Sequence, residues 1–277
     1  RYSCYEKYST MYDWWREKIG SVNLNKLTTA TLTHCKNILM NEEITKGDKK
    51  VVRSANTINK YLMCLSAVLT YASKDLELIP ANPMSKVSKL KKPTGRTRFL
   101  SEKEITKLLD AAKNHSDMLY LFVLLSLSTG GRYSEVRELC VENINKENSM
   151  VYFLDTKNKE HRGVSIPENV LNLLIKYIKD YDIVDGYIFI NKSKNKLYYI
   201  KGMLEKIIKA AGIKDFHIHD IRHTLASYTA MNGGSLLDIA EILGHKSLVM
   251  ARRYSHLTQK HTTSVLYRVT QKIIPDV

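Results

Sequence analysis

The chain has 277 residues, and its 43 Lys and Arg outnumber its 28 Asp and Glu, which leaves a formal net charge of +15 at pH 7. Hydrophobic residues make up 44% of the sequence, a fraction that is typical of folded proteins and excludes an acidic disordered chain. The excess of positive charge indicates a polyanionic partner.

The four cysteines are widely spaced and form no CxxC pair, which argues against both a zinc site and a disulfide framework. The longest apolar stretch, residues 118–127, is about half of the ~20 residues that cross a bilayer. We therefore expect reduced thiols in a cytoplasmic protein that has no membrane partner.

The first third of the chain predicts a small helical domain. Helices are expected over residues 5–18, 28–40 and 56–72, with a basic, glycine-containing loop at 45–50. The third helix has apolar side chains at three- and four-residue spacing, which indicates a buried face: Ile58, Leu62, Leu65, Val68 and Leu69.

A basic segment, residues 86–98, follows this region and is broken by Pro93 and Gly95, as is typical of an interdomain linker. Residues 1–100 carry 18 basic and 8 acidic side chains, a net charge of +10, whereas residues 101–277 carry 25 and 20, a net charge of +5. The linker is either a solvated tether or a strap against phosphates; its predicted DNA contacts are Lys89, Lys91, Lys92, Arg96 and Arg98.

Beyond the linker the sequence alternates helices with one hairpin. Ser101 and Glu104 form a capping box that starts a helix, and a second helix over residues 117–128 stops at Gly130 and Gly131. Strands are expected at 151–154 and 163–166, joined by a polar turn at 157–162. Further helices are expected at 220–231, 236–243, 248–256 and 262–274.

Nucleotide and metal motifs are absent from the sequence, which has no GxxxxGK[ST], GxGxxG or HExxH. We therefore expect no cofactor, neither ATP nor a divalent metal. A cofactor-free enzyme that acts on phosphate must supply positive charge from Arg, Lys and His and a nucleophile from its own side chains.

Arg132 follows a helix that ends at two glycines, and it opens the next helix. An arginine there can join backbone amides in binding one phosphate, and Glu135, on the same helical face, can hold its guanidinium. An ordinary surface arginine is the alternative interpretation.

His219 and Arg222 lie three residues apart at a helix start, so an acid or base would stand beside a cation on one face. The alternatives are a capping role and a metal site of His219 with His223. His245 follows Gly244 at the end of another helix, and Tyr254 stands between Arg253 and Ser255. A tyrosine with an ordinary pKa of about 10 needs cationic neighbours to become a nucleophile, and packing is its commoner role.

Taken in order, the segments TGxR, HDxRHT, LGH and RYxH make the chain resemble the tyrosine recombinases, the phage and conjugative-element integrases in particular. The resemblance implies a mainly α fold with a small β-hairpin or sheet, arranged as a two-domain DNA clamp. It assigns residues 1–85 to a helical core-binding domain, 86–98 to the linker and 99–277 to the catalytic domain, with a C-terminal tail at 258–277.

The resemblance also implies a function: site-specific recombination that integrates or excises a mobile element of a prokaryote or phage. Tyr254 would attack a phosphate of double-stranded DNA to form a 3′-phosphotyrosyl bond. Arg132 and Arg222 would grip that phosphate, His219 would be the base, and His245 would donate a hydrogen bond. The partners would be DNA, a tetramer of the chain, and DNA-bending or directionality helper proteins.

A lysine in a β-hairpin turn protonates the leaving 5′-oxygen in this family, which makes Lys157 the predicted acid, with Lys159 as the alternative. Glu135 would orient Arg132. The sequence departs from the family where Gly131 replaces an apolar residue, which predicts a looser turn. The given sequence also shows no N-terminal region for arm sites, which fits either a truncated chain or a simpler recombinase. The tail helix would pack on a neighbouring protomer or on its own domain.

Two other functions fit parts of this pattern. A type IB topoisomerase-like enzyme would use the same nucleophile without a defined site, and a non-catalytic DNA-binding regulator would use only the basic surface.

Overall fold

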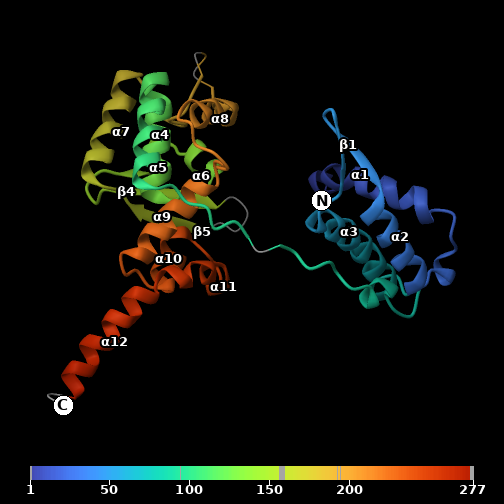
Figure 1. Ribbon diagram of the computed structural model, residues 1–277. Coiled ribbons are helices and arrows are strands. Elements are labelled where there is room, and N and C mark those ends of the chain that lie inside the picture. Colours follow the sequence, from blue (N-terminus) through green and yellow to red (C-terminus); the bar gives the residue numbers. More distant parts are fainter. Residues whose placement is uncertain (1, 94, 156–159, 192, 194, 275–277) are drawn as a thin grey trace. The chain divides into compact units, whose positions relative to one another are not determined.

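The computed structural model describes residues 2–93, 95–155, 160–191, 193 and 195–274 (Figure 1). The chain divides into two compact units, residues 1–94 and 95–277. The boundary between them falls inside the predicted linker. Within the described ranges, no helix is both long enough and apolar enough to cross a membrane.

The N-terminal unit is built from three helices, α1 (Tyr2–Ile19), α2 (Thr29–Asn41) and α3 (Ala55–Lys74). Thr28 and Ser54 cap α2 and α3, because each side chain accepts a hydrogen bond from a backbone amide of the first turn. The core between the helices contains Trp15, Leu39 and Leu62, each at most 3% exposed.

Two sequence predictions for this unit were wrong. The expected loop at 45–50 belongs to an antiparallel hairpin, β1 (Glu43–Lys46) and β2 (Lys49–Val52), whose turn contains Gly47 at a φ of 61°. The exposed and charged strands gave no apolar alternation by which to recognise them. Val68 is 47% exposed, because the buried stripe of α3 is narrower than predicted.

Residues 87–93 and 95–100 form no helix or strand, but both ends of this stretch are anchored. Val87 is buried in the N-terminal unit and Leu100 in the C-terminal unit. Between them Lys89, Lys91 and Lys92 are exposed.

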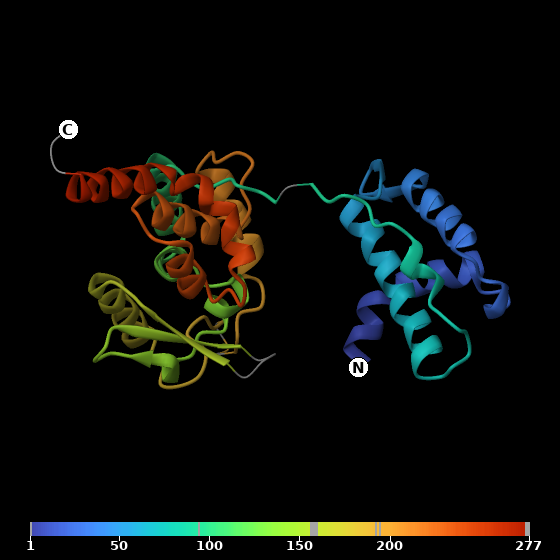
Figure 2. The same ribbon diagram turned by 90° about the horizontal axis from the view of Figure 1, so that it is seen from below.

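The C-terminal unit packs helices against a three-stranded antiparallel sheet of order β3-β4-β5. Helices α4 (Glu102–His115), α5 (Asp117–Thr129) and α7 (Glu168–Asp180) run side by side (Figure 1). The sheet, β3 (Ile144–Asn145), β4 (Met150–Asp155) and β5 (Glu160–Ser165), lies along one side of the unit (Figure 2). The capping box of Ser101 and Glu104 is present at the start of α4, as predicted.

The strands of the hairpin β4–β5 are longer than predicted. Strand β5 begins at Glu160, three residues before the expected start, and Phe153 pairs with Arg162. The first three residues of β5, Glu160, His161 and Arg162, are polar, so the sequence pattern predicted a turn there. Residues 156–159, which include Lys157 and Lys159, lie outside the described residues.

The remaining elements complete the unit around the predicted motifs. They are α6 (Tyr133–Arg137), α8 (Ile200–Ala210), α9 (Asp220–Met231), α10 (Leu236–Leu243), α11 (Leu248–Ala251), a 3-10 segment (Arg252–Leu257) and α12 (Gln259–Ile273). The predicted helix at 248–256 is therefore a short α-helix that continues as 3-10. Helix α12 points away from the rest of the unit (Figure 1), and its side chains Leu266 and Ile273 are 65% and 72% exposed.

Candidate active site

The turn before Arg132 is tight, contrary to the predicted loose turn. Gly130 adopts the left-handed conformation that ends α5, with a φ of 58°. A Cβ on Gly131 would lie 2.7 Å from Cγ2 of Val136 and 2.9 Å from Cζ of Phe153. Glycine is therefore required here by close packing, and the apolar side chain common in the family would not fit this backbone.

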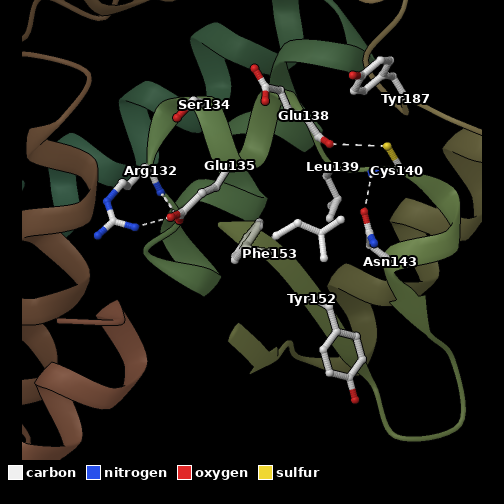
Figure 3. Close-up of a pocket in the computed structure, with 11 residues that line it drawn as sticks. Arg132, Ser134, Glu135, Glu138, Leu139, Cys140, Asn143, Tyr152, Phe153 and Tyr187 are labelled. Carbon is white, nitrogen blue, oxygen red and sulfur yellow. Dashed lines mark hydrogen bonds and ion pairs between the residues drawn. The ribbon is translucent and has the colours of Figure 1, made fainter. Parts of the chain in front are cut away.

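Arg132 is the N-cap of α6, and its side chain is 44% exposed. Its backbone N–H donates to Oε2 of Glu135 at 2.8 Å, and its guanidinium pairs with the other oxygen of the same carboxylate (Figure 3). Burial opposes ionisation of Glu135, but this amide and the nearby guanidinium groups outweigh it and lower its pKa. Glu135 is thus a fixed anion that holds Arg132.

Arg222 is the most deeply buried of the predicted cations, at 4% exposed. Its guanidinium donates to the carbonyl of Gly130 at 2.6 Å and to the carbonyl of Leu243. Burial, followed by repulsion from Arg132 and Arg162, lowers its pKa to about 10, so it stays charged at pH 7. One side chain therefore ties the turn before Arg132 to the end of α10, next to His245.

Two histidines face these cations from different elements. His219 precedes α9 and is exposed, whereas His245 follows Gly244 and is partly buried. Desolvation of each imidazole ring by the protein around it, followed by repulsion from Arg222, lowers the pKa of both, to about 4 for His245. Nδ1 of His245 is buried and has no hydrogen-bond partner among the described residues. Neutral imidazoles beside arginines suit a site that receives an anion.

Tyr254 is 3% exposed and packs in a small apolar cluster with Ala226, Leu243 and Ala251. Its hydroxyl shares a hydrogen bond of 2.5 Å with Nδ1 of His223. Burial raises the pKa of Tyr254, although Arg253 and Arg222 oppose that rise. Burial also lowers the pKa of His223 to about 4, so a neutral histidine holds a neutral phenol.

The structure thus brings together Arg132, Arg222, His245 and Tyr254 with Glu135, and it places His219 at the start of the helix that carries Arg222. Sequence reasoning missed His223, which it considered only as a metal ligand; no cluster of potential metal ligands occurs in the described part of the chain. It also missed Arg162, which it placed in a turn. The i, i+4 spacing to His219 was the one available signal for His223.

Two of the predicted linker contacts are engaged within the C-terminal unit. Arg96 donates to Oδ1 of Asp215 at 3.0 Å and to Oδ2 of the buried Asp220 at 3.1 Å. Arg98 pairs with Glu104. The charges of these two arginines are thus paired with carboxylates, whereas Lys89, Lys91 and Lys92 are exposed.

A pocket of ≈480 Å³ lies beside Arg132 and Glu135 and extends past Tyr152 and Cys140 to Tyr187 (Figure 3). Neither His219 nor Tyr254 lines it. His219 instead lines a second pocket, together with Tyr133 and Phe216.

Comparisons with known proteins match this arrangement. The profile of the phage integrase family matches residues 98–261. The chain is 30% identical over 241 residues to tyrosine recombinase XerA of Saccharolobus solfataricus, covering 84% of this chain and 75% of that protein. It is 26% identical over 266 residues to the shufflon-specific DNA recombinase of Escherichia coli, covering 93% of this chain and 66% of that protein, slightly less than two thirds.

A solved structure shows the same fold over nearly the whole chain. The Tn1549 transposon integrase in complex with transposon right end DNA superposes with a TM-score of 0.78, at 16% identity, and the match covers 96% of this chain and 94% of that one.

Proposed function

The chain belongs to the phage integrase family, the tyrosine recombinases, and from that premise we propose that it is a site-specific DNA recombinase whose nucleophile is Tyr254. The family is an enzyme class that cleaves and rejoins DNA. The substrate is double-stranded DNA, and the product of cleavage is a 3′-phosphotyrosyl bond. The chain would act in the cytoplasm of a prokaryotic cell, on DNA of that cell or of a mobile element.

The observation that carries the proposal is the double hydrogen bond of Arg222 to Gly130 and Leu243. It joins the two loops that present Arg132 and His245, and Tyr254 packs against Leu243 in the same cluster. Two guanidinium groups and a neutral histidine donor can stabilise the charge that develops on the non-bridging oxygens of a phosphate during displacement.

Each step conserves atoms and charge. The phenol of Tyr254 gives its proton to the predicted base His219, its oxygen bonds to phosphorus, and the bond between phosphorus and the 5′-oxygen breaks. The 5′-oxygen takes a proton, for which Lys157 remains the predicted donor. Attack on the phosphotyrosine by the 5′-hydroxyl of a partner strand then releases the tyrosine, so the energy of the phosphodiester is kept and no ATP is consumed.

Tyr254 has to leave its buried position to reach a phosphate. The 3% exposure and the bond to His223 describe a resting conformation. Such a movement would break the packing of Tyr254 and Ala251 in their apolar cluster, whereas the neighbouring side chains Leu248, Val249 and Met250 are already 49%, 68% and 48% exposed. His219 remains the predicted base once the tyrosine has moved.

The exposed tail supports assembly into a tetramer on DNA. Helix α12 leaves Leu266, Val269 and Ile273 exposed, which disfavours packing on its own domain. Deletion of residues 260–277 should convert DNA-bound oligomers into protomers in sizing chromatography, and unchanged oligomers would contradict this assignment. Helper proteins remain a prediction of the family resemblance.

The test of the function is covalent capture. The chain is incubated with a library of short nicked duplexes of randomised sequence, and adducts that survive denaturant are recovered, sequenced and mapped by mass spectrometry. We expect adducts on Tyr254 that share a sequence, and none with Tyr254→Phe. Adducts without a shared sequence would favour the topoisomerase-like enzyme, and DNA binding without adducts would favour the regulator.

A further inference from the structure

Arg162, on β5, is a partly buried cation that has no role in the proposed mechanism. Its side chain is 14% exposed, and its guanidinium lies over the ring of Phe153, 4.9 Å from the centroid. It donates to Oε2 of Glu135 at 2.8 Å and to the carbonyl of Ile242. A buried guanidinium is costly unless its donors are satisfied, and here two elements far apart in sequence satisfy them.

The first of these contacts leads to Arg132. Glu135 accepts from the backbone N–H and the guanidinium of Arg132 as well as from Arg162, so one carboxylate links two guanidinium groups. Arg162 is also among the groups that lower the pKa of Glu135. Arg162 thereby fixes the rotamer and the charge of the residue that holds Arg132.

The second contact leads to His245. Ile242 lies in the last turn of α10, and a Cβ on Gly244 would lie 2.6 Å from Cδ and 3.0 Å from Nε of Arg162. The backbone before His245 therefore rests directly on the Arg162 side chain, and Gly244 is required both for this approach and for its φ of 62°. Arg162 fills the space between α6 and the end of α10.

We propose that Arg162 is a positioning residue that sets Arg132 and His245 against the scissile phosphate, through Glu135 on one side and Ile242–Gly244 on the other. The inference rests on the proposed function. In this proposal β5 holds Arg132 and His245 in place through the side chain of Arg162. A lysine cannot replace this function fully, because a single ammonium lacks the planar fork that reaches two acceptors in fixed directions.

The experiment measures single-turnover adduct formation on the duplex recovered by covalent capture, for the wild type, Arg162→Gln and Arg162→Lys. Each is measured on DNA with a normal scissile phosphate and on DNA with a neutral methylphosphonate there. A misplaced Arg132 matters most when the phosphate is charged, because neutralising that charge is what the arginine does.

We expect Arg162→Gln to cleave the normal phosphate about 100-fold more slowly, and Arg162→Lys about 10-fold more slowly, at DNA affinities within about twofold of the wild type. On the methylphosphonate, the difference between Arg162→Gln and the wild type should shrink to less than about threefold. Arg137→Gln is the matched control, because Arg137 is also a partly buried arginine that pairs with a carboxylate, Glu138, three residues after Glu135. This control should cleave at the rate of the wild type on both the normal phosphate and the methylphosphonate.

Equal losses on both substrates would show a merely structural role and overturn the inference, as would wild-type cleavage by Arg162→Gln. Arg162→Lys keeps the charge and covers the case in which Arg162→Gln does not fold, as judged by circular dichroism. If the wild type formed no adduct, the proposed function itself would fail, which is a different result from a wild type that cleaves while its Arg162 variants cleave equally well.

Discussion

The two units of the chain keep their charges in different places. In the N-terminal unit most basic side chains are on the surface around an apolar core, Arg53 is paired with Glu42, and the polar residue buried as a whole among the described residues is the neutral Asn59. The C-terminal unit, residues 95–277, has nearly the same net charge, +7 against +8 for residues 1–94, yet it buries Asp220, Arg222 and His223 as whole residues. Among the described residues, wholly buried Asp, Arg and His are thus separated into the C-terminal unit.

This difference teaches what each kind of charge can do. Exposed lysines attract a polyanion of any sequence, and salt screens their effect. Buried arginines with satisfied donors hold a fixed direction and cost no reorganisation when charge develops beside them. Variants of the buried arginines should therefore affect the rate of cleavage, and variants of the exposed lysines should affect DNA affinity and its dependence on salt.

The largest expected effect comes from Arg222. Arg222→Gln should reduce single-turnover adduct formation by about 1000-fold and leave DNA affinity within about threefold, because the side chain acts on transition-state charge. Arg222→Lys, which keeps the charge and loses one of the two carbonyl contacts, should fall between. An equally large loss of DNA affinity would contradict the comparison, because Arg222 would then act like the exposed lysines, through its attraction for DNA.

Gly131→Ala should lower the free energy of unfolding by about 1–3 kcal/mol, because its Cβ would overlap Val136 and Phe153. Thermal unfolding followed by circular dichroism measures this loss. Ser134→Ala, at an exposed position of the same helix α6, is the control and should be neutral. An equally neutral Gly131→Ala would mean that the turn is looser than the structure has it.

Replacement of Lys89, Lys91 and Lys92 by Gln should weaken DNA binding about fivefold at moderate salt. The slope of log affinity against log salt should fall by up to ~3, because each lysine that neutralises a phosphate contributes about 0.9. Cleavage at saturating DNA should not change. The matched control replaces three exposed lysines of α4, Lys103, Lys107 and Lys113, with the same change in net charge. An equal effect of both triple variants would mean that the linker lysines contribute to DNA binding only through the net charge of the chain.

The smallest expected effect is a dependence of stability on pH. Burial and the nearby arginines hold the pKa of His245 at about 4 in the folded state, below its ordinary 6.5. As the pH falls below 6.5 the unfolded chain takes up the proton first, so stability that is present above pH 6.5 is lost by about pH 4.

For this single group the loss should be about 1–2 kcal/mol, after allowance for its partial exposure. His245→Gln should therefore flatten the decline of the melting temperature between pH 6.5 and 4 relative to the wild type. A decline of the same steepness in both proteins would mean that His245 titrates normally.

Local patterns predicted much of the fold. The helices around residues 56–72, 117–128, 220–231 and 236–243 have caps, glycine stops or apolar periodicity, and each occurs within a few residues of its expected position. The hairpin β1–β2 and the start of β5 were missed, because their strands are polar and a period of two cannot be seen without alternating hydrophobicity.

The candidate site was predicted in its residue types and not in its contacts. Motif order identified Arg132, Arg222, His245 and Tyr254. It gave no indication that His223 bonds to the tyrosine, because that bond joins residues 31 positions apart through the packing of α9 on the 3-10 segment. It also gave no indication that Arg96, a predicted phosphate contact, pairs with Asp215 and Asp220, 119 and 124 positions away.

The sequence by itself determined the net charge, the caps and glycine stops of several helices and the inventory of chemical groups, because these depend on composition and on neighbours along the chain. Only the tertiary structure decided which guanidinium groups are buried, which carbonyls and carboxylates satisfy them, and where the tyrosine hydroxyl rests. Those outcomes depend on desolvation and on hydrogen bonds between segments that meet only after folding. Burial of Arg162 and Arg222 is tolerated because Glu135, Gly130, Ile242 and Leu243 arrive at the same place.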